Sequence, residues 1–299
     1  MLYEPLPLGK TTLSVSPMAW GMWRLRGDDV SAAQGLVEAA LDAGLTFFDT
    51  ADIYGPDNGE PFGASEALLG RVLAQAPHLR QRFVLASKGG ISMGVPYDSS
   101  PTYLTQAVED SLARMGVETI DLYQIHRPDM MSHPAEVAAT LSRLRAAGKI
   151  GEIGVSNHTV AQVAALTAHL DFPLASHQVE FSPLVIAPLS DGTLDQAMER
   201  GLGVMAWSPL AQGRLAGGET TDPRVLAVRS ALGDIALTHG VSVTVAAYGW
   251  LLAHPARPIP IVGSQQVARI AEAPAALKLK LSRTEWYAVL TAARGVPLP

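Results

Sequence analysis

Gly44-Leu45-Thr46-Phe47-Phe48-Asp49-Thr50-Ala51-Asp52-Ile53-Tyr54-Gly55 is the stretch of sequence around which the chain is organised. Its first part, 45–48, is a short apolar run without polar alternation, as expected of a strand buried on both faces in a parallel sheet. Asp49 stands where this run stops, and Tyr54 follows in a loop bounded by glycine. A carboxylate at the carboxyl end of a buried strand, with a phenol close behind it, is typical of the catalytic rim of a barrel enzyme.

The same alternation of strand-like and helical segments recurs along the chain. A hairpin around Gly9-Lys10 precedes a first core strand at 18–20, and further strand-like runs lie at 45–48, 83–87, 120–125, 150–155, 175–180, 203–207 and 259–262. Helical patterns separate them, beginning at Ser31 and recurring near 64–76, 101–115, 134–147, 159–169, 191–201 and 222–253. Eight such units favour a closed (β/α)₈ TIM barrel over an open sheet. We therefore predict one α/β domain over 1–299, with an N-terminal β-hairpin and extra C-terminal helical segments.

Composition excludes several classes of partner. Apolar residues make up 48% of the chain and charged residues only 17%, and the net charge is −6 without a basic cluster. Nucleic acid and anionic membrane surfaces both require clustered Lys and Arg, so neither is expected as a partner. The absence of cysteine from the sequence rules out disulfides, thiol catalysis and cysteine metal ligands.

The sequence shows no recognisable targeting signal, and we therefore expect a soluble, cytoplasmic protein. Met1-Leu2-Tyr3-Glu4-Pro5 lacks the basic and apolar regions of a signal peptide. No apolar run approaches the roughly 18 residues of a membrane span. The sequence gives no indication of the oligomeric state.

Polar residues that follow the predicted strands are expected to share one rim of the barrel. They are Asp49, Tyr54, Lys88, His126, Ser156, Asn157, Gln178, Trp207 and Ser208. Each has a simpler interpretation when taken alone: Asp49 as a cap, Lys88 as a solvated strand end, Tyr54 as a loop anchor and His126 as a core histidine. Their joint placement is what favours catalysis.

The chemistry of four of these residues fits together. A phenol with a pKa near 10 is a poor proton donor at neutral pH, and an ammonium beside it stabilises the phenolate and lowers that pKa. Lys88 is expected to supply this charge, and Asp49 to hold Lys88. His126 can donate a hydrogen bond that orients a carbonyl. Such a site protonates an oxygen as hydride reaches its carbon, which is carbonyl reduction.

The chain resembles the aldo-keto reductase family over essentially its whole length, and within it the bacterial YdhF-like branch. The resemblance rests on Phe48–Gly55 and on the segments 126–129, 191–196 and 206–210. It implies that Asp49, Tyr54, Lys88 and His126 form the catalytic tetrad. It also implies NADPH-dependent reduction of aldehydes or ketones to alcohols, without a Gly-rich dinucleotide fingerprint. None is found in a strand-to-helix turn here, which makes a Rossmann enzyme a poor fit.

The resemblance also assigns residues to the cofactor. Ser156, Asn157 and Gln178 correspond to positions that bind the nicotinamide carboxamide, and Trp207 to a ring that stacks on the nicotinamide. Ser208-Pro209-Leu210, with Arg214, corresponds to the segment that covers the pyrophosphate. The full set of expected cofactor-binding residues adds Gly21, Met22, Trp23, Gln212, Gly263, Ser264, Gln266, Arg269 and Glu272.

One departure from the family concerns the 2′-phosphate of NADP. Many members place a lysine before the serine and an asparagine after the glutamate of this segment, where this chain has Gly263 and Ala273. Ser264, Arg269 and the amino end of the helix beginning near Val267 are left to hold the phosphate. NADPH is favoured over NADH, although Arg269 has the simpler interpretation of a solvated helix residue.

The substrate pocket is expected at the barrel mouth. Trp23, Tyr54, His126 and Arg127 are its candidate residues, with Tyr123 as an alternative to Arg127. The substrate is expected to be a small carbonyl compound, and an apolar wall at Trp23 would favour aromatic or aliphatic ones.

Two other functions compete with carbonyl reduction. A metal-dependent barrel hydrolase needs several histidines that reach one point, often as His-x-His, and this sequence has no such pair, so no metal is expected. The alternative is a non-catalytic sensor or regulatory subunit that binds a nicotinamide nucleotide on the same barrel. Retention of all four catalytic groups argues against it, because a pure binder does not need them.

Overall fold

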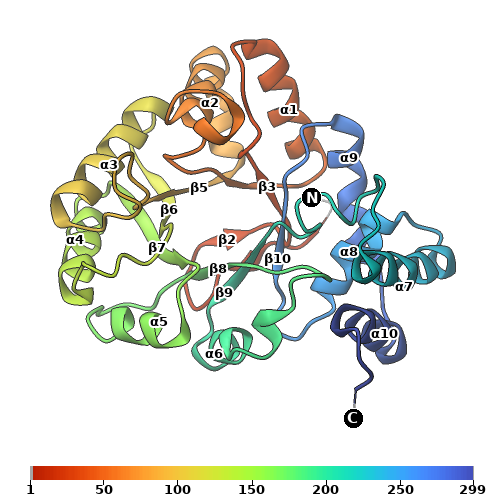
Figure 1. The fold of residues 1–299 in the computed structure, drawn as a ribbon. Helices are drawn as coiled ribbons and strands as arrows, with labels where there is room; N and C mark the ends of the chain where they lie inside the picture. Colours follow the sequence, from red (N-terminus) through yellow and green to blue (C-terminus); the bar gives the residue numbers. More distant parts are fainter. Residues whose placement is uncertain (1–2, 299) are drawn as a thin grey trace.

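A closed barrel of eight parallel strands forms the centre of the computed structural model, which describes residues 3–298 (Figure 1). Neighbouring strands follow chain order, and β10 pairs with β3 to close the ring. The strands are β3 (Ala19–Gly21), β4 (Phe47–Asp49), β5 (Val84–Gly89), β6 (Ile120–Ile125), β7 (Ile150–Ser156), β8 (Ser176–Glu180), β9 (Gly203–Trp207) and β10 (Ile259–Val262). The predicted TIM barrel is therefore confirmed.

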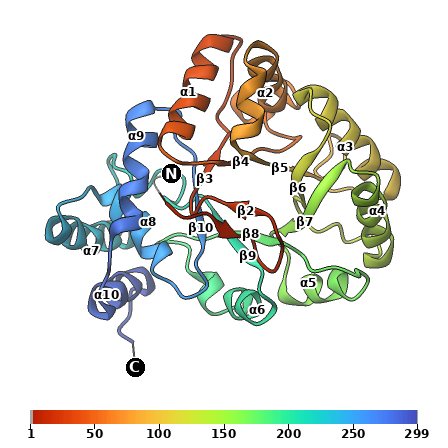
Figure 2. The ribbon, with the colours of Figure 1, turned by 180° about the vertical axis from the view of Figure 1, so that it is seen from behind.

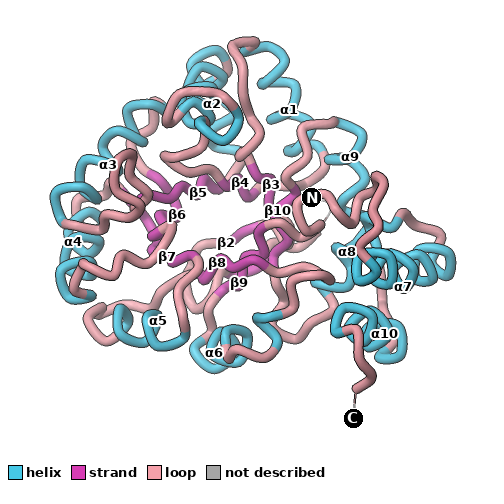
Figure 3. Tube along the Cα trace, in the orientation of Figure 1, coloured by secondary structure: helices cyan, strands magenta, loops and turns pink. Residues whose placement is uncertain are grey.

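Helices surround the strands as an outer ring (Figures 1 and 3). Those that connect successive strands are α1 (Val30–Asp42), α2 (Ala64–Gln75), α3 (Pro101–Met115), α4 (Pro134–Ala146), α5 (Val160–Thr167), α6 (Thr193–Arg200), α7 (Pro223–His239) and α8 (Val243–Leu252). After β10 come α9 (Val267–Glu272) and α10 (Arg283–Arg294), and α10 packs against α7. These last helices are the predicted C-terminal addition.

The N-terminal hairpin covers the amino-terminal end of the barrel, as the reverse view shows (Figure 2). It consists of β1 (Leu6–Pro7) and β2 (Ser14–Val15), paired antiparallel. Leu8 and Val15 are buried and pack with Phe47 in the barrel interior. Since the hairpin covers this end, the polar site is confined to the opposite rim.

Local sequence explains how the chain enters the central stretch. Asp29 caps α1 by accepting a hydrogen bond from the main-chain N–H of Ala32. The helix ends at Asp42, and Gly44 then turns the chain with a φ of +79°, a conformation that favours glycine. The chain passes straight into β4, so that Asp49 reaches the rim as the strand's last residue.

Several predicted boundaries differ from the structure, and three of the differences lie at the first two strands and near the C-terminus. The pattern over 222–253 forms two helices, α7 and α8, because Gly240 adopts a φ of +64° and Ser242 caps a new helix. The first strand covers 19–21 in place of 18–20, and β4 begins at Phe47 in place of Leu45.

No single helix within residues 3–298 has the length and apolar composition needed to cross a membrane, although α7 and α8 together meet this test across a bend of 95°. Met1 and Leu2, which entered the signal-peptide argument, lie outside the described residues.

Candidate active site

Asp49 and Lys88 form a buried ion pair at the open rim. Lys88 Nζ donates to Asp49 Oδ2 over 2.7 Å and to the main-chain oxygen of Thr50 over 2.6 Å. Their side chains are 0% and 3% exposed, for Lys88 and Asp49 respectively. Burial alone would lower the pKa of Lys88, but Asp49 and Tyr54 outweigh burial and raise it above its ordinary value. Lys88 is therefore charged at neutral pH.

Two glutamine amides approach the other oxygen of Asp49. Gln178 Nε2 donates to Asp49 Oδ1 over 2.9 Å, and Gln124 Nε2 lies 3.4 Å from the same oxygen. Sequence reasoning assigned Gln178 to the cofactor alone and did not single out Gln124. The available signal was strand alternation, since Gln124 precedes the rim residue His126 by two positions and so faces the same way.

Tyr54 and His126 lie beside this ion pair. Lys88 Nζ is 4.9 Å from the centre of the Tyr54 ring, and the Tyr54 and His126 rings meet edge to face at 5.9 Å. Burial raises the pKa of Tyr54 above 10, and the opposing effect of Lys88 does not reverse it. Lys88 thus acts on this pKa in the expected direction, but burial outweighs it and the net shift is upward, so Tyr54 keeps its proton at neutral pH.

His126 is neutral at the same pH. Burial lowers its pKa well below 6.5, and the positive charges of Lys88 and Arg127 lower it further. Its main-chain N–H donates to the oxygen of Gly89 over 2.8 Å, which fixes the residue to the end of β5. A neutral imidazole has one N–H to donate, so His126 can hydrogen-bond an oxygen held between it and Tyr54.

Asn157 ties together the ends of three strands. Its Nδ2 donates to the main-chain oxygen of His126 (3.1 Å) and to Ser156 Oγ (2.8 Å). Its Oδ1 accepts from Trp207 Nε1 over 2.9 Å. The backbone of Asn157 has a φ of +58°, a value that asparagine tolerates better than most residues. Ser156, Asn157 and Trp207 are thus brought together, with the Trp207 ring fixed at the rim.

The loop after β9 is held by a residue that sequence reasoning missed. Ser208, Ala211 and Gln212 in this loop have positive φ values. The Arg229 guanidinium, from α7, donates to the main-chain oxygens of Arg214, Gly217 and Gly218 over 2.7, 2.5 and 2.7 Å. The loop that contains Pro209, Leu210 and Arg214 is therefore fixed from the outside. A lone arginine within a helical pattern gave no signal of this role.

The segment after β10 lies next to the first strand. Trp20 Nε1 donates to the oxygen of Ser264 over 3.1 Å, and Gln265 Nε2 donates to the oxygen of Gly21 over 3.3 Å. Arg269 is exposed and makes no ion pair within residues 3–298. The surface around it also includes Gln266 and Glu272, both exposed. A Cβ added to Gly263 would meet no atom within 4 Å, so a side chain fits there.

Gly21 and Met22, two of the predicted cofactor-binding residues, expose no side chain at the rim. Met22 is fully buried in the core between the strands and the helices, and its N–H donates to the oxygen of Asp49 over 2.9 Å. A Cβ on Gly21 would come within 2.6 Å of Ile261. Any contact of Gly21 or Met22 with a cofactor would therefore go through the backbone.

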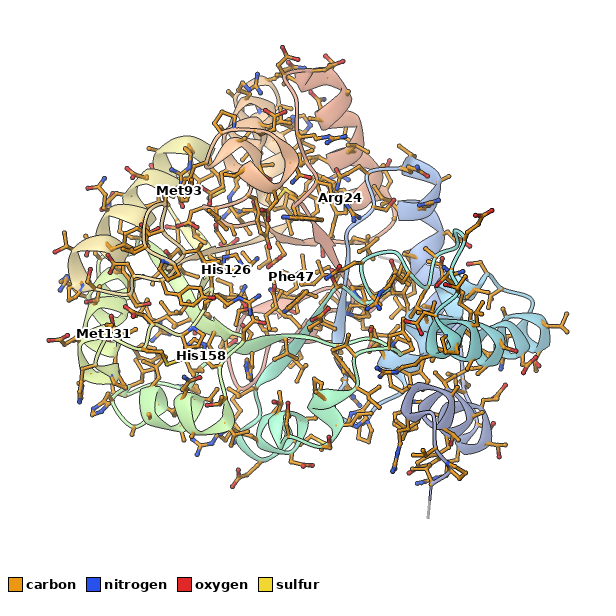
Figure 4. The ribbon with its side chains drawn as sticks, viewed as in Figure 1. Arg24, Phe47, Met93, His126, Met131 and His158 are labelled. Atoms are coloured by element: carbon orange, nitrogen blue, oxygen red, sulfur yellow. The ribbon has the colours of Figure 1, made fainter. Side chains whose placement is uncertain are left out.

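Aromatic and charged side chains surround the mouth. Trp23 is 39% exposed, with the Arg24 guanidinium 5.0 Å from its ring, and the Arg127 guanidinium lies 5.8 Å from the Trp207 ring. Figure 4 shows His126 and Phe47 toward the middle of the ring of elements, and Met93 and Met131 toward its edge. Tyr123, the alternative pocket residue, is fully buried in the core between the strands and the helices. It therefore does not line the mouth of the pocket.

Comparison with known proteins identifies the family of this chain. The model of the aldo/keto reductase family matches residues 17–293. The chain belongs to the aldo/keto reductase family. This confirms the family predicted from the sequence, and an aldo-keto reductase is an oxidoreductase that uses NAD(P)H and acts on small carbonyl compounds.

Several relatives of this aldo-keto reductase cover nearly all of it. A 6-dehydroglucose reductase from Novosphingobium aromaticivorans is 55% identical over 99% of both chains. Oxidoreductase YdhF from Escherichia coli is 37% identical over 95% of both chains. A 6-dehydroglucose reductase from Agrobacterium fabrum is 35% identical over 95% of this chain and 96% of its own. The similarity to YdhF confirms the predicted branch.

Solved structures confirm the fold of the aldo-keto reductase. The thermostable aldo-keto reductase Tm1743, crystallised with the inhibitor epalrestat, superposes with a TM-score of 0.82 at 24% identity. The match covers 97% of this chain and 100% of that one.

Within residues 3–298, no three His, Asp or Glu side chains are placed to hold a metal ion.

Proposed function

We propose that this aldo-keto reductase reduces the aldehyde group of an oxidised sugar, with NADPH as the preferred hydride donor. The observation that carries the chemistry is the buried Lys88–Asp49 pair beside a protonated Tyr54. The sugar substrate is supported by the 55% identical relative, whose name is 6-dehydroglucose reductase.

Each rim residue has a distinct part in the proposed reaction. When bound, NADPH supplies the hydride. Tyr54 gives its proton to the carbonyl oxygen, and the Lys88 charge stabilises the phenolate that this leaves. Asp49 holds Lys88 in place, and Gln178 and Gln124 hold Asp49. His126 donates its N–H to the same carbonyl oxygen and orients it toward Tyr54.

The chain's own residues suit a nicotinamide cofactor. The Trp207 ring, fixed by Asn157, offers a flat apolar surface on which a nicotinamide can stack. The loop from Ser208 to Arg214, fixed by Arg229, would cover the pyrophosphate. Ser264 and Arg269 would bind the 2′-phosphate. The amino end of α9 would stabilise the phosphate less than expected from the sequence, because this helix contains only six residues.

Charged groups at the mouth support a polar substrate. Burial raises the pKa of Glu180, and Arg214 and Arg127 lie close enough to oppose that shift. Guanidinium and carboxylate groups donate to and accept from hydroxyl groups, which a sugar presents in quantity. Arg127, which stands next to the carbonyl-orienting His126, would bind a hydroxyl of the substrate.

The test compares a sugar aldehyde with a plain aromatic one. We expect NADPH-dependent turnover of 6-dehydroglucose, and slower turnover of 4-nitrobenzaldehyde. Replacing Arg127 by methionine is expected to raise KM for the sugar about tenfold, the effect of a lost charged hydrogen bond, and to change KM for nitrobenzaldehyde far less. Equal effects on both substrates would contradict the sugar assignment. Cofactor binding without turnover of any carbonyl compound would support the sensor alternative.

Gly263 provides a separate test of the cofactor preference. Because a side chain at this position meets no atom within 4 Å, Gly263→Lys should fold normally and place an ammonium beside the 2′-phosphate site. We expect the ratio of kcat/KM for NADPH over NADH to increase about tenfold, since a charged contact of this kind contributes roughly 1.4 kcal/mol. Gly263→Gln is the matched control, with similar length and no charge. An equal gain for Gln would show that charge is not the cause.

A further inference from the structure

Two further buried carboxyl groups, those of Glu66 and Asp52, lie behind Lys88, between the barrel wall and the helices α2 and α3. Glu66, on α2, is fully buried and has partners for both oxygens: Ser87 Oγ donates to Oε1 over 2.5 Å and Arg114 Nε to Oε2 over 2.8 Å. Asp52, three residues after β4, is 1% exposed. Within residues 3–298, neither of its carboxylate oxygens has a hydrogen-bond partner.

A second buried oxygen without a partner lies beside Asp52. The Tyr123 hydroxyl, on the outward face of β6, is fully buried and makes no hydrogen bond to another described residue. Both groups border Gly89: a Cβ built there would lie 2.1 Å from Tyr123 Oη and 3.0 Å from Asp52 Oδ2. Only glycine leaves room for the carboxyl and the hydroxyl to approach each other.

Asp52 is also connected to the catalytic strand through its backbone. Its N–H donates to the main-chain oxygen of Lys88 over 2.9 Å. The Lys88 side chain points to one face of β5, and a Cβ on Gly89 would point to the opposite face, toward Asp52, so Asp52 contacts the strand from behind the rim. A change at Asp52 therefore reaches Lys88 through one hydrogen bond.

The charges around Asp52 leave it without a cation of its own. Arg114, from α3, pairs with Glu66, and Lys88 pairs with Asp49. Burial raises the pKa of Asp52 well above its ordinary value and the negative Glu66 raises it further, whereas Arg114, the N–H of Ile53 and Lys88 oppose this. The remaining facing groups are phenols, Tyr123, Tyr103 and Tyr54, and the pKa of each is raised. The surroundings thus favour the uncharged carboxyl.

We propose that Asp52 is a positioning residue of the reduction site, held as a neutral carboxylic acid next to the Tyr123 hydroxyl behind Lys88. A proton on the carboxyl removes an unpaired negative charge from a buried position where neither oxygen has a hydrogen-bond partner. When Asp52 is neutral, it does not offset the stabilisation of the Tyr54 phenolate by the positive charge of Lys88. An ionised Asp52 would raise the pKa of Tyr54, against the direction in which Lys88 acts.

The first test measures the proton directly and does not depend on the proposed function. Infrared spectra are recorded at about pH 8, where ordinary carboxyls are ionised, on protein with ¹³C-labelled aspartate carboxyl groups. We expect an isotope-sensitive band of a protonated carboxylic acid in the wild type, its loss in Asp52→Asn, and a frequency shift in Tyr123→Phe. A wild-type spectrum without that band would overturn the proposal.

The second test uses activity and rests on the proposed function. Asp52→Ala is expected to lower kcat about tenfold with little change in KM, because it removes the carboxyl behind Lys88 without touching the substrate and keeps the main-chain hydrogen bond to Lys88. Asp52→Asn should restore most of that loss, since an amide matches the shape and neutrality of the acid. Failure of Asn to restore kcat would show that the charge is required and would overturn the proposal. Wild-type protein that shows the band but reduces no carbonyl compound would instead count against the proposed function alone.

Discussion

A Tyr54→Phe variant is expected to bind NADPH as the wild type does and to lose about 10²–10⁴-fold in kcat for carbonyl reduction, the range attributed to a positioned general acid. The change removes one oxygen and keeps the ring that lies 4.9 Å from Lys88 Nζ and 5.9 Å from the His126 ring. Packing is therefore preserved while the proton donor is lost. Steady-state kinetics measure kcat, and quenching of tryptophan fluorescence measures NADPH binding.

The pH profile of the wild type distinguishes Tyr54 from other donors. Since the pKa of Tyr54 is raised, its proton is present below that pKa and is lost as the pH rises through it, above 10. The rate of reduction should therefore fall only in that alkaline range, and this limb should be absent from the residual activity of Tyr54→Phe. Tyr287→Phe, at an exposed tyrosine of α10, is the control. A Tyr54→Phe variant with wild-type kcat would show that another group delivers the proton.

The sequence was sufficient for the barrel and for most of its rim because both follow from local patterns. Apolar runs separated by helical spacing identify β9 and β10 at their observed bounds. Parallel strands bring their carboxyl ends to one edge, so Asp49, Lys88 and His126 converge wherever they fall in the chain.

The contacts that the sequence did not predict depend on register and on exact side-chain placement. Gln178 reaches Asp49 across 129 positions of sequence, and this requires the relative stagger of β4 and β8. The role of Arg229 depends on where a loop folds back over α7. The isolation of Asp52 follows from the pairing of Arg114 with Glu66, since in sequence Arg114 is an equally suitable partner for either carboxylate.

A Lys88→Met variant is expected to lower the free energy of unfolding by about 3–5 kcal/mol, because it leaves the Asp49 carboxylate buried without its cation. Asp49 is 2% exposed, and its remaining partners are the neutral amides of Gln178 and Gln124. Adding Asp49→Leu to Lys88→Met should recover much of that loss, since a buried pair replaced by apolar residues of similar volume is often tolerated. Denaturation by urea measures each stability. The exposed pair Lys149–Glu109 is the control, and Lys149→Met should cost at most about 1 kcal/mol.

This double-mutant comparison separates what the ion pair does for folding from what it does for catalysis. Stability should return in the double variant, whereas turnover should be absent from both Lys88→Met and the double variant, because neither keeps both the ammonium and the carboxylate that holds it. If Lys88→Met proved no more destabilising than Lys149→Met, the Asp49 carboxylate would have to be protonated or adequately satisfied by its glutamine partners. If the double variant recovered turnover along with stability, Tyr54 would act without a charge beside it, and the assignment of Lys88 would be wrong.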